Sequence, residues 1–356
     1  MRWRYLVPMT EKRNIRHNPV LFGIVLAVML TIVIFCAVFL QNAPGPDQNN
    51  PALEPKQTLE DIEAQFEPLR QQYMQQRGKI DLDKLITQAK AIAEKHPEFA
   101  PGQLFVGQLY FDKGDLTNAQ SYIDKSLKLD PDQGPVHLLA GNIALMQKDP
   151  KTAADHLSLA VKLEPSNAQY WLYLGQSYFA QSDWSQAQEC YEKAYELDSD
   201  MILALNGKAD CQVKQNQLAQ AVYTMQQAID QTPLGKRKTK VVYLRKQARL
   251  LSELGKPNEA LVVMGKLTDA EKAQLPIASE MASYWDQLGE PGKAAEVYEQ
   301  LLAKDLRNWD LAAKAAQWRI KAGDKDKAQQ HLLHIQLINP DLPVIKELEK
   351  ELGDVD

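Results

Sequence analysis

The chain has 356 residues and a formal charge of −5, with 45% hydrophobic and 24% charged residues. These proportions are normal for a folded protein and argue against extensive disorder. The mild negative charge argues against nucleic acid as the main partner, because nucleic-acid-binding domains usually carry a strong basic excess. The cysteines, Cys36, Cys190 and Cys211, have no metal or redox spacing. We expect free thiols, although a bridge between Cys190 and Cys211 is conceivable.

The first predicted element is a transmembrane helix over residues 19–40. This stretch contains no charged residue. A helix of this length spans about 33 Å at 1.5 Å per residue, enough to cross the hydrocarbon core of a bilayer. A cleaved signal peptide would have a shorter apolar region, followed by a small-residue cleavage site that is not found here. The pattern therefore predicts an uncleaved signal anchor in contact with the lipid bilayer.

The flanks of this span predict its orientation. Residues 1–18 hold five basic residues and one acidic residue, and the first basic residue after the span is Lys56. The positive-inside tendency places residues 1–18 in the cytoplasm and the remainder beyond the plasma (inner) membrane, in the periplasm of a bacterium. A cytoplasmic location of the folded part is the alternative. Residues 41–57 are rich in Pro, Asn and Gln and are predicted to form an extended linker.

Helical periodicity begins after this linker, at Thr58. Apolar residues recur at helical spacing from Ile62 to Tyr73, and again from Leu82 to Ile92. We interpret residues 58–99 as a degenerate helical hairpin that precedes a more regular array.

From residue 100 onward, one sequence pattern recurs at a constant step, the one that separates Gly107, Gly141 and Gly175. The copy that begins at Ala168 is the fullest and reads W-x₂-L-G-x₂-Y followed by A-x₃-Y. The residues that define the pattern are Gly107, Ala119, Pro131, Gly141, Ala153, Pro165, Trp171, Leu174, Gly175, Tyr178, Ala187, Tyr191 and Ala194. Both the pattern and its step resemble the tetratricopeptide repeat (TPR) family. In that family the small residues let two helices approach closely, and the large residues fill the space between neighbouring hairpins.

The resemblance implies an all-α fold, a right-handed α-solenoid of helical hairpins that binds protein partners. About seven repeats are predicted, at residues 100–133, 134–167, 168–201, 202–240, 241–274, 275–308 and 309–342. Residues 343–356 are expected to form a C-terminal capping helix and tail. Corresponding alanines keep the constant step except for Ala221 and Ala260, which are farther apart. We expect the extra residues in a loop around 234–240. The turns between paired helices are expected at Gly114, Gly255, Gly289 and Gly323.

The resemblance also implies which residues face the concave side. Positions 2, 5, 9 and 12 of the first helix of each repeat carry that role in the family, and we map positions 5, 9 and 12 onto this chain. In the first three repeats they are Leu104, Gln108, Phe111, Leu138, Asn142, Leu145, Leu172, Gln176 and Phe179. Such an apolar ladder with a polar row suits an amphipathic helix or an extended peptide of a protein partner. The alternative is that these residues pack against the chain's own hairpin, residues 58–96.

In later repeats the same positions become polar. They include Asn206, Arg245 and Arg249, and further lysines lie close in sequence. This basic cluster could be a solvated loop, or it could meet an acidic protein segment or anionic lipid headgroups.

No motif of the chain predicts chemistry. A phosphate-binding loop, a nucleophile elbow and paired catalytic carboxylates are not found. His331 and His334 share a helix face, but the segment supplies no third ligand. We therefore expect no catalytic residue, metal or cofactor.

The sequence predicts a non-enzymatic, membrane-tethered scaffold that recruits or assembles partner proteins. One alternative is an accessory or regulatory subunit of a membrane biogenesis complex, for polysaccharide or cytochrome assembly. Another is a cytoplasm-facing adaptor or co-chaperone. Neither the partner nor the oligomeric state follows from the sequence.

Overall fold

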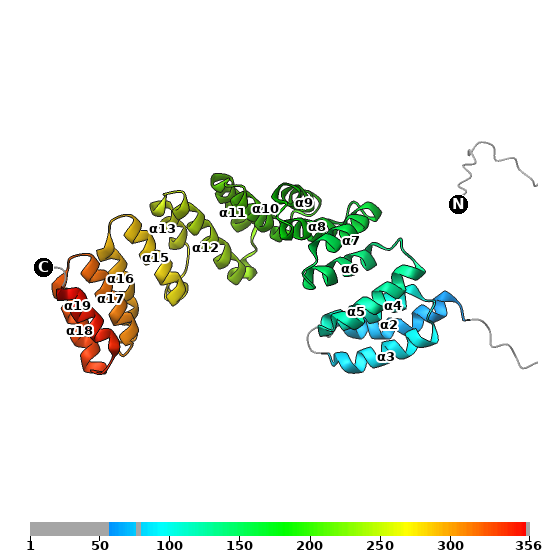
Figure 1. Cartoon of the computed structure of the whole chain (residues 1–356), viewed down its shortest axis with the longest axis horizontal. Helices are drawn as coiled ribbons and strands as arrows, with labels where there is room; N and C mark the ends of the chain where they lie inside the picture. Colours follow the sequence, from blue (N-terminus) through cyan, green and yellow to red (C-terminus); the bar gives the residue numbers. More distant parts are fainter. Residues whose placement is uncertain (1–56, 76–79, 354–356) are drawn as a thin grey trace, which may run out of the picture. The chain divides into compact units, whose positions relative to one another are not determined.

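Every regular element in the computed structural model is a helix within the described residues, 57–75 and 80–353 (Figure 1). The prediction of an all-α fold is confirmed for this part of the chain. The predicted anchor 19–40, its basic flank 1–18 and linker residues 41–56 lie outside the described residues. Among the helices that are described, none has the length and apolar character needed to cross a bilayer.

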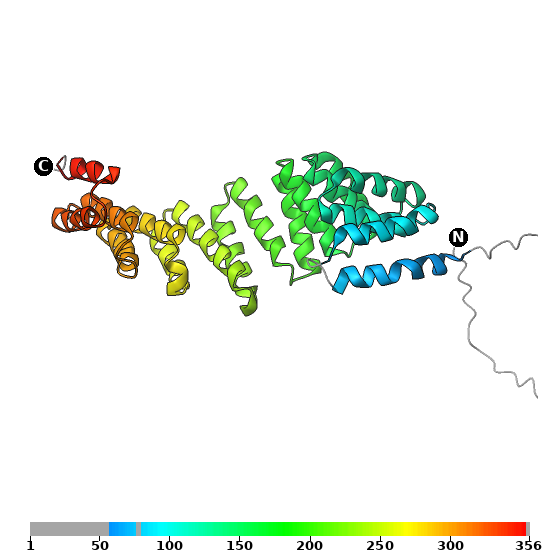
Figure 2. The ribbon, with the colours of Figure 1, turned by 90° about the horizontal axis from the view of Figure 1, so that it is seen from below.

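The helices follow one another as pairs joined by short turns (Figures 1 and 2). The pairs up to residue 231 are α2 Leu59–Gln75 and α3 Leu82–Lys95, α4 Ala100–Lys113 and α5 Leu116–Leu129, α6 Gly134–Met146 and α7 Pro150–Leu163, α8 Ala168–Ala180 and α9 Trp184–Leu197, α10 Ile202–Lys214 and α11 Leu218–Gln231. The later elements are η2 Leu234–Lys236, α12 Arg237–Glu253, α13 Pro257–Gly265, α14 Asp269–Lys272, α15 Leu275–Gln287, α16 Pro291–Leu302, α17 Trp309–Lys321, α18 Lys325–Ile338 and α19 Pro343–Gly353.

A residue in the left-handed region ends the first helix of seven of these pairs. Glycine occupies this position at the four predicted turns, with φ of 85° at Gly114 and 72–74° at the other three. In the three intervening pairs Lys148, Ser182 and Asn216 adopt φ of 60–64°. Glycine is the usual residue in this conformation because it has no Cβ. The three non-glycine residues adopt the same left-handed backbone conformation at the equivalent position of their repeats. The packing of the two helices, as well as the residue type, therefore determines the turn.

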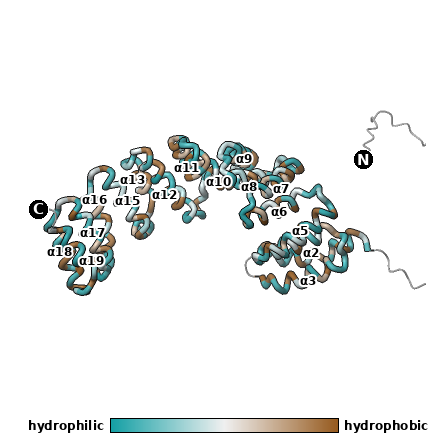
Figure 3. The backbone as a smooth tube through the Cα atoms, viewed as in Figure 1, coloured by the Kyte–Doolittle hydropathy of each residue, from teal (hydrophilic) through white to brown (hydrophobic). Residues whose placement is uncertain are grey.

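Alanines of the second helix of each pair lie at the centre of the packing. Seven of them are fully buried, namely Ala119, Ala153, Ala187, Ala221, Ala260, Ala294 and Ala328. Their small side chains allow the paired helices to approach closely, and large residues fill the space around them. Leu174 and Tyr191 are buried, whereas Trp171 and Tyr178 are half-buried. Hydrophobic and hydrophilic residues alternate along the helices, as expected when one side of each helix is buried (Figure 3).

One close contact gives a stability prediction. The ring of Tyr191 lies against two glycines, and a Cβ at Gly207 would come within 2.6 Å of it. We expect Gly207→Ala to lower the free energy of unfolding by about 1–3 kcal/mol, because the buried ring must shift. Gly235→Ala is the control, since a Cβ there meets no atom within 4 Å. Thermal melts followed by circular dichroism measure both variants. Equal melting temperatures for the two would contradict the steric argument.

The prediction of a loop around residues 234–240 was wrong. Residues 234–236 form the single turn η2, and residues 237–240 begin α12, so this helix starts before the predicted boundary at Val241. The Arg237 guanidinium donates hydrogen bonds to Glu271 (Nε–Oε1, 2.8 Å) and to the carbonyl oxygen of Lys266 (3.2 Å). These bonds hold the first turn of α12 against α14 and the segment before it. The extra residues therefore lengthen a helix.

Candidate functional site

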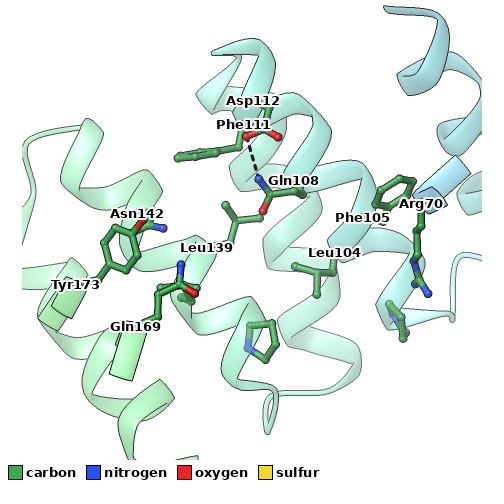
Figure 4. A pocket seen from close by; sticks show the side chains of 13 residues that line it. Arg70, Leu104, Phe105, Gln108, Phe111, Asp112, Leu139, Asn142, Gln169 and Tyr173 are labelled. Carbon is green, nitrogen blue, oxygen red and sulfur yellow. Dashed lines mark hydrogen bonds between the residues drawn. The ribbon is translucent and has the colours of Figure 1, made fainter. Parts of the chain in front are cut away.

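A pocket of about 410 Å³ lies across α4, α6 and α8 (Figure 4). Its walls are built from residues at equivalent positions of successive pairs. These are Pro101, Pro135 and Gln169; Arg70, Leu104 and Leu138; Phe105, Leu139 and Tyr173; and Gln108 and Asn142; with Phe111 and Asp112 at its edge. The repeat thus aligns like positions into one surface, which we call the α4–α8 groove.

The structure brings five of the predicted groove residues together in this groove. They are Leu104, Gln108, Phe111, Leu138 and Asn142. The other four residues predicted for the first three repeats do not line it.

These four have other surroundings. Leu172 is only 7% exposed and belongs to a core cluster with Ala187 and Tyr191. The Phe179 ring packs edge-on against Trp184, with ring centres 4.8 Å apart. Leu145 packs on the core around α7, and Gln176 is exposed outside the groove.

Arg70 was missed, although it precedes Leu104 by the same step that separates Leu104 from Leu138. It comes from α2, where its Nη1 bonds to Glu63 (3.0 Å) and its guanidinium lies about 6 Å from the ring centres of Phe66 and Phe105. Of the described residues in 58–96, Arg70 alone lines the groove. In the described part, therefore, the first hairpin contributes to one end of the groove and does not fill it.

The polar groups of the groove differ in how well they are satisfied. The Gln108 side chain donates to Asp112 (Nε2–Oδ1, 3.0 Å), and the Tyr73 hydroxyl donates to the same carboxylate. The Oδ1 atom of Asn142 is buried and has no hydrogen-bond partner. Figure 4 shows this side chain beside Tyr173. A buried acceptor without a donor is unusual in a folded protein and calls for an explanation.

The predicted polar residues of the later repeats are held in internal pairs. Arg245 bonds to Glu280 through two nitrogens (3.0 and 2.7 Å), and Arg249 bonds to the same carboxylate. The Nζ of Lys246 contacts Asn206 Oδ1 (2.7 Å). Both arginines are thus engaged with one internal carboxylate, so this surface lacks the free arginine fork that a partner's carboxylate would need.

The histidines form no metal site in the described residues. His331 Nε2 contacts Glu299 Oε1 (3.0 Å), while His334 Nε2 contacts the carbonyl oxygen of Leu306 (2.7 Å). A histidine pair not foreseen from sequence joins α6 to α7, with 3.1 Å between the Nδ1 atoms of His137 and His156. Burial lowers the pKa of His156. In the part of the chain that is described, no group of three His, Cys, Asp or Glu residues could hold a metal ion.

Cys190 and Cys211 are both buried and free. Burial raises the pKa of each thiol to about 12. Because the thiolate is the reactive form, both cysteines are unreactive at neutral pH.

Comparison with known proteins supports the repeat assignment. A family model described as tetratricopeptide repeat matches residues 106–168, 138–184 and 172–235. The matched residues, 106–235, include most of the groove. No curated protein matches the chain in sequence.

Several solved structures are similar to it. The crystal structure of MamA protein is 20% identical, with a TM-score of 0.43, over 48% of this chain and 91% of that one. MamA 41-end from Desulfovibrio magneticus RS-1 is 21% identical, with a TM-score of 0.44, over 49% and 97%. YrrB, described as a TPR protein with an unusual peptide-binding site, is 15% identical, with a TM-score of 0.38, over 74% and 97%.

Proposed function

We propose that the chain is a non-enzymatic, membrane-tethered scaffold that recruits partner proteins through the α4–α8 groove. The observation that carries this proposal is the Asn142 side chain, which lines the pocket and whose buried Oδ1 atom has no hydrogen-bond donor in the described chain. An unsatisfied buried acceptor costs about 1–3 kcal/mol. A ligand that supplies an N–H group removes this cost when the Asn142 amide rotates toward it on binding.

The remaining lining favours a protein segment as that ligand. Leu104 and Leu138 are half-buried and supply apolar contact to side chains. A polypeptide offers backbone N–H groups at regular spacing, which suits an acceptor set between apolar residues. The groove would therefore hold one extended or helical segment, with its backbone at Asn142 and its apolar side chains against the two leucines.

Tethering is proposed from the charge-free residues 19–40 and their basic N-terminal flank. The scaffold would face the extracytoplasmic side of the plasma (inner) membrane, with residues 1–18 in the cytoplasm. A reporter that is active only outside the cytoplasm, fused after Asp356, tests this orientation. An active reporter on a protein that resists carbonate extraction is expected. An inactive reporter would reverse the orientation, and extraction into the soluble fraction would remove the tether.

The substitution Asn142→Leu tests the groove. It replaces the unpaired acceptor with an apolar group of similar size, so the free energy of unfolding should be unchanged or higher. Binding of the partner segment should weaken about tenfold or more, because the segment's N–H group loses its acceptor. The variant should therefore lose binding without losing stability. If Asn142 had a purely structural role, binding would weaken only together with stability.

The readout is site-specific photocrosslinking of the full chain in cells. A photoreactive residue in place of Gln108 lies in the groove, and one in place of the exposed Lys162 on α7 is the matched control. We expect crosslinks that map by mass spectrometry to one partner segment from the groove position alone. Asn142→Leu should reduce them. Equal crosslinking from both positions would refute the groove as the binding surface.

A further inference from the structure

A second surface, separate from the groove, is formed by η2 and the first turn of α12, residues 234–240, which we call the basic turn. The Leu234 side chain at its start is 93% exposed. Lys236 and Lys238 are exposed, and Lys240 is half-exposed. No carboxylate of the described residues pairs with these three lysines, whereas Arg237 between them is paired with Glu271. The turn therefore presents three free cations and one apolar side chain to solvent.

The basic turn is held in place. Arg237 donates to Glu271, and this hydrogen bond lowers the pKa of Glu271 to about 2. The same carboxylate accepts from the backbone N–H of Thr268, in a capping box at the start of α14. These bonds tie the backbone of the basic turn to α14, which limits the ordering that binding would require.

Its electrostatics are unfavourable in the isolated protein. Lys236 is the N-cap residue of α12, and Lys238 and Lys240 lie in the first turn of this helix, whose N-terminus carries the positive end of the helix dipole. The helix starts without an acidic residue in its first turn and without a side-chain cap. An external layer of negative charge would relieve this repulsion, and an apolar layer beneath it would take up Leu234.

We propose that the basic turn docks on an anionic bilayer surface, with Leu234 between the headgroups and the lysines on phosphate oxygens. At about 100° per residue, Lys236 and Lys240 project on one side of Arg237, and Lys238 projects on the other. Such a spread suits a plane of many charges better than a single carboxylate. The chain's net charge of −5 makes this cluster a local exception, so it selects which side of the array faces lipid.

The inference rests in part on the proposed tether. The linker of residues 41–57 can extend at most about 60 Å, so an anchor at 19–40 would keep the array near the membrane. At such a high effective concentration a weak contact becomes occupied. Each lysine near an anionic surface raises partitioning by about fivefold, so three lysines are sufficient for this role.

The test uses the full chain in nanodiscs of phosphatidylcholine alone or with one part in four of phosphatidylglycerol. Amine acetylation is measured residue by residue by mass spectrometry, with Lys151 and Lys162 of α7 as exposed controls. We expect about threefold or greater protection of Lys236, Lys238 and Lys240 in the anionic discs only, reversed at high salt. Equal labelling in both discs would overturn the proposal. Protection by soluble polyglutamate but not by anionic discs would assign the turn to an acidic protein.

Two variants sharpen the result. Replacing the three lysines with glutamate puts favourable charge at the α12 N-terminus, so this variant should fold. Hydrogen exchange of residues 232–242 should lose its dependence on anionic lipid in this variant, and should lose part of it in Leu234→Ser. Flotation with phosphatidylcholine vesicles reports the tether alone. Flotation without lysine protection rejects the basic turn and keeps the tether, whereas failed flotation rejects the tether.

Discussion

Phe66→Ala is expected to lower the free energy of unfolding by about 3–5 kcal/mol, the usual cost of removing a fully buried ring. The Phe66 side chain is 0% exposed. Its ring stacks on Phe99 (5.8 Å between centres) and meets Phe105 edge-on (6.3 Å). It also lies against Gly102, where a Cβ would come within 2.7 Å of the ring. The surrounding helices cannot close such a space without losing these contacts.

The loss should appear first at α2, because Phe66 joins this helix to α4. Hydrogen exchange is expected to accelerate along α2, and thermal melts give the stability change. Met74→Ala on the same helix is the control, since Met74 is 69% exposed and its truncation should change stability by less than about 0.5 kcal/mol. Unchanged protection of α2 in Phe66→Ala would show that other contacts hold this helix.

Release of α2 would also alter the groove. Arg70 reaches the groove from α2, and the Tyr73 hydroxyl on the same helix donates to Asp112 at the groove edge. Phe66→Ala should therefore weaken partner binding, although Phe66 itself does not line the groove. A variant that keeps full binding after losing α2 would limit the functional groove to α4, α6 and α8.

The repetitive part of the fold could be predicted because its causes are local. A small residue such as Ala153 or Ala187 is required where two helices approach closely, and both are fully buried. Because the pattern recurs at a constant step, the same requirement recurs in each repeat. The lengthened α12 could not be predicted in this way. Lysine, arginine and threonine are compatible with either a loop or a helix. The choice depends on the bond from Arg237 to Glu271, a residue far along the chain on a different element.

The groove could be predicted only in part for a related reason. Periodicity assigns the same role to Leu138 and Leu172, yet Leu172 is buried because Ala204 and Cys211 of α10 belong to the same core cluster. Arg70 was missed because its repeat lacks the glycine and alanine pattern that marks the later ones. Arg245 pairs with Glu280 of a different repeat. The repeat pattern describes positions within one repeat, so it does not reveal this partner.

A buried arginine that joins α17 to α16 gives the second large effect. Arg319 is 5% exposed and donates to both oxygens of Glu299 (2.7 Å each), while His331 contacts the same carboxylate (3.0 Å). Arg319→Leu should lower the free energy of unfolding by about 3–5 kcal/mol, because it leaves a half-buried carboxylate without its main partner. Chemical denaturation measures this loss.

Two further variants separate the causes. Lys321→Ala removes an exposed pair with Asp286 on the same helix as Arg319, and should cost less than about 1 kcal/mol. The double variant Arg319→Leu with Glu299→Leu should recover much of the stability lost in Arg319→Leu, because no unpaired charge remains. Equal losses in the single and double variants would show that packing of the Arg319 side chain matters more than its charge.

The pH dependence of the two proteins should differ in sign. The hydrogen bond from Arg319 lowers the pKa of Glu299 from 4.5 to about 2. In the wild type this carboxylate therefore contributes its full stabilisation above about pH 4.5, and the contribution is lost as the pH falls from there toward about 2. In Arg319→Leu the carboxylate is half-buried without its guanidinium, so burial favours the protonated form. Relative to wild type, the variant should regain stability as the pH falls from 7 to 4, and a constant difference across that range would contradict a charge-based origin.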